Sequence, residues 1–213
     1  MTKFQTRADA GKQLAAELLA RGLHADLVLG LPRGGVLVAA EVASALKLPL
    51  DALVVRKIGH PHHREVAVGA LAEDGTMKLD DGVSHWLIPA AELDAVIAEE
   101  TARLQDYRSK FHARTPLDLR GKRVLIVDDG LATGATAEVA ALSARNRGAE
   151  TIRVAVPVAS PSAVTRVGQV ADAVTALRVD PDFEAVGCYY VSFPQTTDDE
   201  VIDILAQGTR NPD

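Results

Sequence analysis

One stretch, residues 124–136 (VLIVDDGLATGAT), constrains the fold more than any other part of the chain. Its first four residues are all apolar, which is typical of a strand buried on both faces of a parallel sheet. Two acids, Asp128 and Asp129, follow directly, and a turn rich in glycine and threonine then leads into a helical pattern. The stretch therefore predicts a buried strand, an acidic turn and a helix in direct succession.

The rest of the chain alternates between helical and strand patterns, which indicates an α/β fold with a parallel sheet flanked by helices. The predicted helices cover residues 9–21, 35–46 and 89–112, the segment after 134, and the segment after a capping box at Thr197 and Glu200. The further predicted strands cover residues 27–29, 50–57, 66–72, 151–158 and 174–177. We expect a single domain over residues 1–213.

The acidic turn has the chemistry of a sugar-phosphate site. Ligands of open α/β sheets bind at the carboxyl ends of the strands. The backbone N–H groups of Thr133, Gly134, Ala135 and Thr136 would open the next helix, where unpaired amides and the helix dipole favour an anion. The two carboxylates would repel a phosphate, so they suit vicinal hydroxyls or a metal held through water. Together these groups match a ribose 5-phosphate.

Composition excludes several other classes of protein. The net charge of −6 argues against a nucleic-acid binder that works by bulk electrostatics. Cys188 is the one cysteine, so neither an internal disulfide framework nor a multi-cysteine metal site is possible. No apolar run approaches the roughly 20 residues of a membrane span, and charges interrupt the first 20 residues throughout. We therefore expect a cytoplasmic protein without membrane or nucleic-acid partners.

The stretch at 124–136 resembles the 5-phosphoribosyl 1-pyrophosphate (PRPP) motif of type I phosphoribosyltransferases. The resemblance implies that Asp128 and Asp129 hold the ribose hydroxyls and, through water, a Mg²⁺ ion. The residues implied to hold the 5-phosphate are Thr133, Gly134, Ala135 and Thr136, and Gly130 and Ala132 of the same turn are further expected substrate-binding residues. The alternative is a generic strand–turn–helix with acids at the turn, as in phosphorelay receivers or Rossmann sheets.

A second segment, GLPRGG at residues 30–35, fits the same resemblance. In the family this position is the loop that binds pyrophosphate. Arg33 offers a bidentate fork for phosphate, and Gly34 and Gly35 allow an unusual backbone. The family often has a cis peptide that does not involve proline here, for which Arg33–Gly34 is the candidate. Taken alone, Arg33 would be read as a solvated turn residue.

A third segment, VVRKIG at residues 54–59, ends a predicted strand with Arg56 and Lys57. The resemblance implies that these basic residues contact the pyrophosphate and that the polar stretch at 58–66 is a mobile loop that closes over the site. That stretch contains His60, His62 and His63, whose spacing does not match a helical pair of zinc ligands.

Residues 76–115 are expected to be a helical insertion, which is not standard for the nucleobase enzymes of the family. Residues 178–213 are expected to form a small hood with a C-terminal helix, and the segment at 180–195 is similar to the hood of purine phosphoribosyltransferases. Phe183 is the candidate for stacking on an acceptor base, although aromatic residues in this segment could equally fill the core. Ala132 stands where the purine branch has an aspartate that is proposed as a general acid or base.

The resemblance, which is closest to a bacterial group whose acceptor is not established, implies a Mg²⁺-dependent transferase. It would move the 5-phosphoribosyl group of PRPP to a nitrogen acceptor, such as a nucleobase, and release pyrophosphate; a homodimer would be ordinary for the family. Two alternatives stay open: a regulator that senses PRPP or a nucleotide without catalysis, and a PRPP enzyme with an acceptor other than a nucleobase.

Overall fold

The computed structural model describes residues 2–80, 88–112 and 116–208. Its main element is a five-stranded sheet in which every neighbouring pair is parallel, with strand order β2-β1-β6-β7-β8. The strands are β1 (Leu27–Gly30), β2 (Leu50–Ala52), β6 (Arg123–Val127), β7 (Thr151–Ala159) and β8 (Ala173–Val179). The predicted α/β class with a parallel central sheet is therefore confirmed.

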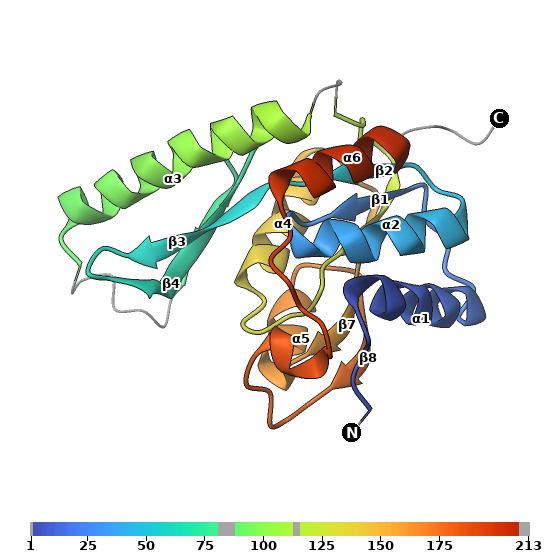
Figure 1. Cartoon of the computed structure of the whole chain (residues 1–213). Helices are drawn as coiled ribbons and strands as arrows, with labels where there is room; N and C mark the ends of the chain where they lie inside the picture. The colour runs from blue at the N-terminus through green and yellow to red at the C-terminus, as the bar shows by residue number, and fades with distance from the viewer. Residues whose placement is uncertain (1, 81–87, 113–115, 209–213) are drawn as a thin grey trace.

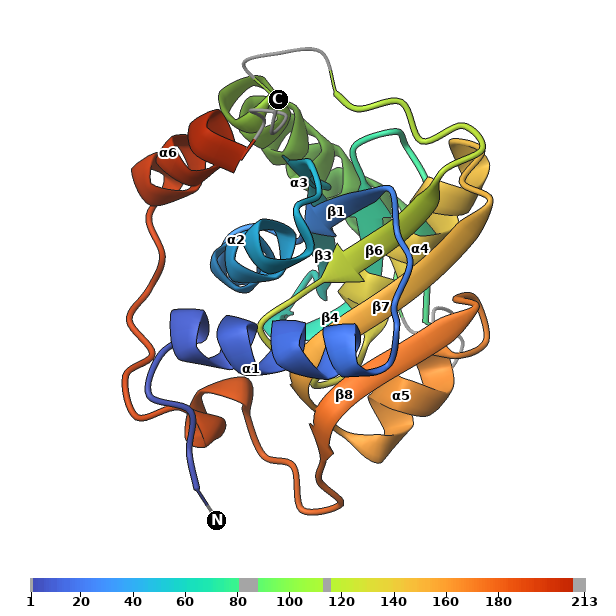
Figure 2. The same ribbon diagram turned by 90° about the vertical axis from the view of Figure 1, so that its right-hand side faces the viewer.

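Helices cover both faces of this sheet (Figures 1 and 2). One face packs against α1 (Arg7–Ala20) and α2 (Gly34–Leu46), and the other against α4 (Ala135–Asn146) and α5 (Pro161–Val167). Residues of β6 alternate between the two cores, with Leu125 and Val127 on the α2 side and Val124 and Ile126 on the α4 side. The all-apolar run at 124–127 thus forms a strand that is buried on both faces, as predicted.

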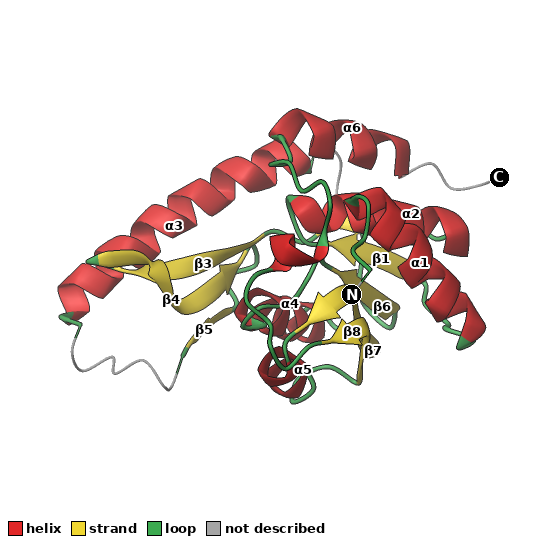
Figure 3. Ribbon diagram, turned by 60° about the horizontal axis from the view of Figure 1, so that its bottom comes forward, coloured by secondary structure: helices red, strands yellow, loops and turns green. Residues whose placement is uncertain are grey.

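A second, antiparallel sheet lies beside the main sheet. It contains β3 (Val55–His60), β4 (His63–Ala72) and β5 (Met77–Leu79), and the long helix α3 (Ala90–Phe111) lies along it (Figures 1 and 3). Strand β5 and helix α3 fall within the predicted insertion at 76–115, of which residues 81–87 and 113–115 lie outside the described part. Helix α3 follows the predicted helix at 89–112 to within one residue at each end.

The predicted polar loop at 58–66 is wrong for most of its length. Strand β3 runs on to His60 and β4 begins at His63, so this segment is the tip of a hairpin. The pairing contains irregularities on either side of Gly59, which interrupt the alternation of apolar and polar residues that marks a strand in sequence. The predicted strand at 50–57 divides in two, with β2 in the main sheet and β3 in the hairpin.

The segment before α1 pairs with residues near position 190 beside the main sheet. Phe4 forms a parallel bridge with Tyr190: the Phe4 N–H donates to the Tyr189 carbonyl at 2.9 Å, and the Val191 N–H donates to the Phe4 carbonyl at 2.8 Å. A short 3-10 turn (Val186–Tyr189) precedes the bridge, and α6 (Asp198–Gly208) follows it and packs on α2. The predicted capping box is present, since the Thr197 N–H donates to Glu200 Oε2 at 2.8 Å. None of the described helices is long and apolar enough to cross a membrane.

Candidate active site

The acid pair lies where two neighbouring parallel strands end. Strand β6 leads into Asp128 and Asp129, and β1, which pairs with β6 in parallel register, leads into the loop that contains Gly34 and Gly35. A methyl group on Gly35 would lie 2.7 Å from Asp128 Oδ1, and one on Gly34 would overlap the Asp129 carboxylate. The structure thus brings these four predicted residues together, and neither glycine position has room for a side chain.

The turn after the acid pair forms a cup of free backbone amides. Gly134 adopts a left-handed conformation with φ 75° and begins α4 without any side-chain cap. Within the described residues, the N–H groups of Thr133, Gly134, Thr136 and Ala137 have no hydrogen-bond partner, whereas the Leu131 N–H is held by the Val158 carbonyl at 2.9 Å. Free amides at the positive end of a helix dipole bind a phosphate group well.

Arg7, on the first turn of α1, is a site residue that the sequence analysis missed. Its Nε donates to Asp129 Oδ2 at 2.7 Å, and one of its terminal nitrogens donates to the Pro194 carbonyl at 2.7 Å. The guanidinium lies 3.7 Å from the centre of the Phe193 ring, and the residue is 8% exposed. Because Arg7 is 122 residues from Asp129 in the chain, no local pattern in the sequence could have revealed this contact.

The electrostatics of the acid pair favour a ligand that donates hydrogen bonds or carries positive charge. Burial raises the pKa of Asp128 well above its usual range, and the neighbouring charge of Asp129 adds to this effect. Burial also raises the pKa of Asp129, although the hydrogen bond from Arg7 opposes this shift. Asp128 Oδ1 accepts from the Asp129 N–H at 2.8 Å. Asp128 Oδ2 and Asp129 Oδ1 have no hydrogen-bond or ion-pair partner among the described residues.

Arg33 stands at the start of α2, at the mouth of the same loop. Its guanidinium lies 3.6 Å from Asp198 Oδ1 of α6, and its side chain is 32% exposed. The cis peptide precedes this residue, at Pro32–Arg33, so the predicted position at Arg33–Gly34 is wrong by one residue. The Gly-rich pattern indicates the loop but does not distinguish between its adjacent peptide bonds.

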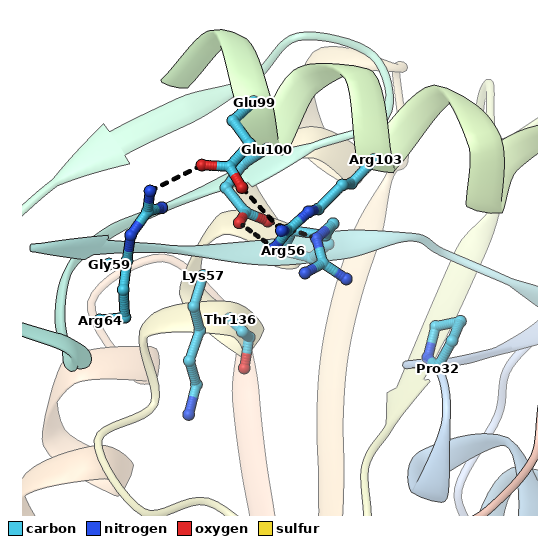
Figure 4. A pocket seen from close by; sticks show the side chains of 10 residues that line it. Pro32, Arg56, Lys57, Gly59, Arg64, Glu99, Glu100, Arg103 and Thr136 are labelled. Carbon is cyan, nitrogen blue, oxygen red and sulfur yellow. Dashed lines mark hydrogen bonds and ion pairs between the residues drawn. The ribbon is translucent and has the colours of Figure 1, made fainter. Parts of the chain in front are cut away.

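Arg56 and Lys57 are adjacent on β3 and therefore point to opposite faces of the strand. Arg56 Nε donates to Glu100 Oε2 of α3 at 2.5 Å, and its guanidinium lies 5.2 Å from the Tyr107 ring. Lys57 is exposed, points away from α3 (Figure 4) and has no hydrogen-bond or ion-pair partner in the described part of the chain. Lys57 is thus free to meet an anion, whereas Arg56 is already paired.

A pocket of about 540 Å³ separates α3 from the phosphate cup (Figure 4). Its lining includes Pro32, Lys57 and Thr136 on the cup side, and a chain of ion pairs on the α3 side. That chain consists of Arg64–Glu99 (2.7 Å), Glu99–Arg103 (2.6 Å), Arg103–Glu100 (3.0 Å) and Glu100–Arg56 (2.5 Å). The hairpin and α3 therefore extend the candidate site beyond the main sheet.

The aromatic residues near the end of the chain pack mainly against one another. The Phe183 ring stacks on Tyr189, with ring centres 5.3 Å apart, within a cluster that also contains Phe4 and Tyr190. This packing favours the core alternative for Phe183. Two other rings lie beside the acid pair: the Tyr190 hydroxyl donates to the Asp129 carbonyl at 2.6 Å, and Phe193 packs on the guanidinium of Arg7.

The histidine stretch does not form a metal centre. Among the described residues there is no group of three or more His, Cys, Asp or Glu side chains that could hold a metal ion. His62 Nε2 instead lies 2.8 Å from Glu92 Oε2 of α3. The acid pair does fit Mg²⁺, because two carboxylate oxygens are unpaired there and Mg²⁺ commonly binds one or two carboxylates together with substrate oxygens and water.

Comparison with known proteins gives a consistent result. The sequence model of the phosphoribosyl transferase domain matches residues 2–191. The chain is 45% identical over 213 residues to a protein of Mycobacterium tuberculosis named "Putative phosphoribosyl transferase Rv0571c", covering 99% of this chain and 48% of that protein. It is 28% identical over 143 residues to uracil phosphoribosyltransferase of Staphylococcus aureus, which covers 62% of this chain and 64% of that protein.

A solved structure shares the fold over nearly the whole length. The crystal structure of TT1426 from Thermus thermophilus matches with a TM-score of 0.79 at 41% identity, covering 98% of this chain and 100% of that chain. The chain spans about half the length of the M. tuberculosis relative.

Proposed function

The chain belongs to the phosphoribosyltransferase family, and on that premise we propose that it transfers the 5-phosphoribosyl group of PRPP to a nitrogen acceptor. One observation carries the proposal: four free amides at the start of α4 lie on the same turn as two carboxylates whose outer oxygens are unpaired. A phosphate and a vicinal diol are the groups that this pair of sites accepts, and a ribose 5-phosphate carries both.

Each group of the site has a role in such a transfer. The cup at 133–137 holds the 5-phosphate, and Asp128 and Asp129 accept hydrogen bonds from the 2- and 3-hydroxyls. The bond from C1 to pyrophosphate breaks, the bond from C1 to the acceptor nitrogen forms, and the acceptor proton leaves to solvent. The acids favour the positive charge that develops on the sugar, and Arg33 and Lys57 favour the negative charge on the leaving pyrophosphate.

The proposal includes Mg²⁺ as cofactor, with Asp128 and Asp129 as the residues that would hold it. When bound, the ion supplies positive charge to the pyrophosphate oxygens. Ala132 offers no acid or base near the acceptor, so we expect an acceptor that reacts as a nucleophile without help from that position. A cytoplasmic location is part of the same proposal and is supported by the single cysteine.

A sensor that binds PRPP without transfer is the second candidate. The ion pair between Arg56 and Glu100 favours it, because it withdraws from the site one of the cations expected to stabilise the leaving group. An acceptor other than a nucleobase remains within the transferase proposal, although the S. aureus relative is named for uracil.

The test is to incubate the full chain with PRPP, Mg²⁺ and a panel of nucleobases and amines while pyrophosphate is measured. Release that depends on one acceptor supports the transferase, and the Asp128→Asn/Asp129→Asn double variant should abolish it while circular dichroism stays unchanged. PRPP binding by calorimetry without release under any condition supports the sensor. Absence of PRPP binding would overturn both.

A further inference from the structure

Arg7, the buried arginine of α1, contacts both the acid pair and residues 189–194. These residues are one part of the predicted hood at 178–213, and we call them the hood segment. We infer that Arg7 is a positioning residue, which fixes the Asp129 carboxylate for the ribose and joins it to the hood segment. This inference rests on the proposed function, since it assigns the carboxylate to a sugar. It adds a residue from α1 to a site otherwise built from strand β3 and from the segments that follow β1 and β6.

The cation of Arg7 is buried and paired. Its side chain is 9% exposed, and an ion removed from water to that extent needs a partner of opposite charge and good geometry. Within the described residues, Asp129 is the one carboxylate within ion-pair distance of Arg7. Arg7 therefore cannot be read as a solvated surface charge that lies near the site by chance.

The Asp129 carboxylate takes its orientation from this pairing. Arg7 holds Oδ2 of Asp129 at 2.7 Å, and the backbone of Gly34 packs against that same oxygen. With Oδ2 held in this way, the direction of Oδ1 is set as well. Oδ1 has no protein partner among the described residues, so Arg7 presents one oxygen of Asp129 to a ligand while it occupies the other.

The hood segment is linked to the carboxylate through the same guanidinium. Arg7 donates to the Pro194 carbonyl at 2.7 Å and lies 3.7 Å from the centre of the Phe193 ring. The Tyr190 hydroxyl also reaches this point, donating to the Asp129 carbonyl at 2.6 Å. A shift of the hood segment therefore moves the partners of Arg7, and the sugar site and the hood segment take up their positions together.

A double-mutant cycle on ribose 5-phosphate affinity tests the inference. The four proteins are wild type, Arg7→Gln, Asp129→Asn and the double variant, each measured by calorimetry without metal and checked by circular dichroism. We expect each single variant to weaken binding roughly tenfold or more. We expect the double variant to bind no more weakly than Asp129→Asn alone, because Arg7 acts through that carboxylate. Arg7→Lys, which keeps the charge, should recover part of the affinity.

The control is Arg21→Gln. Arg21 caps the C-terminal end of the same helix and forms an exposed ion pair with Glu17, so its loss should change the affinity for ribose 5-phosphate less than twofold. If Arg7→Gln does not fold, Phe193→Leu replaces it in the cycle, because it removes the ring under the guanidinium and spares both charges. Additive losses in the cycle, or full affinity in Arg7→Gln, would overturn the inference while leaving the proposed function intact. If the wild-type protein binds neither ribose 5-phosphate nor PRPP, the proposed function itself is overturned, and the inference with it.

Discussion

His112, at the C-terminal end of α3, has its Nε2 2.8 Å from Glu73 Oε2, and each of the two side chains is only 5% exposed. Asp51 of β2 lies on the other side of the ring, 3.4 Å from Nδ1, and Arg147 lies 3.5 Å from Glu73. A histidine flanked by two carboxylates is held in its charged form. This cluster fastens the end of α3 to the main sheet.

The stability of the protein should fall at alkaline pH because of His112. Burial by itself lowers the pKa of His112, but hydrogen bonds to Asp51 and Glu73 outweigh burial and raise the pKa from 6.5 to about 9. The stabilisation is complete below the unfolded value of 6.5 and is lost as pH rises through about 9. We expect a loss on the order of 2 kcal/mol in the free energy of unfolding between about pH 6.5 and 9.5. Urea titrations across this range measure it, and His112→Gln should remove the dependence; an equal slope in both proteins would contradict the prediction.

Gly34→Ala should abolish binding of ribose 5-phosphate. The added methyl group would occupy the place of the Asp129 carboxylate and lie 2.7 Å from Arg7 Nε, so the ion pair has to break or the loop has to move. Calorimetry with ribose 5-phosphate measures the effect. Gly22→Asn is the matched control, since that glycine has open space around it and asparagine tolerates its φ of 63°. Wild-type affinity for ribose 5-phosphate in Gly34→Ala would contradict the prediction, because it would show that the segments of Gly34 and Asp129 can move apart without loss of binding.

Gly134→Ala should impair both stability and phosphate binding. Its φ of 75° is unfavourable for alanine, which costs about 1–2 kcal/mol, and the new Cβ would lie 3.1 Å from Val167. Gly121→Ala separates the two effects, because Gly121 has a φ of 67° with no atom near its Cβ position. We expect both variants to unfold at lower urea concentration and only Gly134→Ala to lose affinity for ribose 5-phosphate. Equal affinity for ribose 5-phosphate in the two variants would show that the amide cup does not bind this ligand.

Glu100→Gln should strengthen the binding of pyrophosphate. The glutamate is buried and pairs with both Arg56 and Arg103. Neutralising it leaves Arg56 free to face the pocket, whereas Arg103 keeps its ion pair with Glu99. We expect the dissociation constant for pyrophosphate to fall several-fold in calorimetry at low salt. Glu99→Gln, on the exposed side of the same ion-pair chain, is the control and should have the smaller effect. Unchanged affinity in Glu100→Gln would show that Arg56 does not reach the anion.

The parts of the site that follow from local sequence could be predicted. The strand, acid pair and amide cup at 124–136 lie in one continuous segment, whose burial and turn chemistry are visible in the sequence without information from elsewhere in the chain. The segment with Gly34 and Gly35 is also continuous, but it was assigned to the site only through the family resemblance. The parallel order of β1 and β6 then brings the two segments together. The fold class and the segment of the acid pair and amide cup could therefore be predicted from the residues.

The parts that depend on distant contacts were not accessible. The pairing of Arg7 with Asp129 spans 122 residues, and that of Arg56 with Glu100 spans 44, so neither has a local signature. The predicted strands at 50–57 and 66–72 overlap β3 and β4, but the tip of this hairpin was predicted as a loop. There the strand pairing is irregular and polar residues face α3 as well as solvent. In each case the deciding energy comes from tertiary packing.

The contacts between the segment around Phe4 and Arg7 and the hood segment have a consequence for folding during synthesis. The contact between Arg7 and Pro194 joins positions 187 residues apart, so the arginine is synthesised well before its hood partners and meets them only after residue 194 has emerged. Closing so long a loop is a late event in folding. A nascent chain that has already formed the parallel sheet thus passes through a stage in which Asp129 lacks the full set of neighbours that orient it, and the proposed ribose site is complete only after residue 194 has been added.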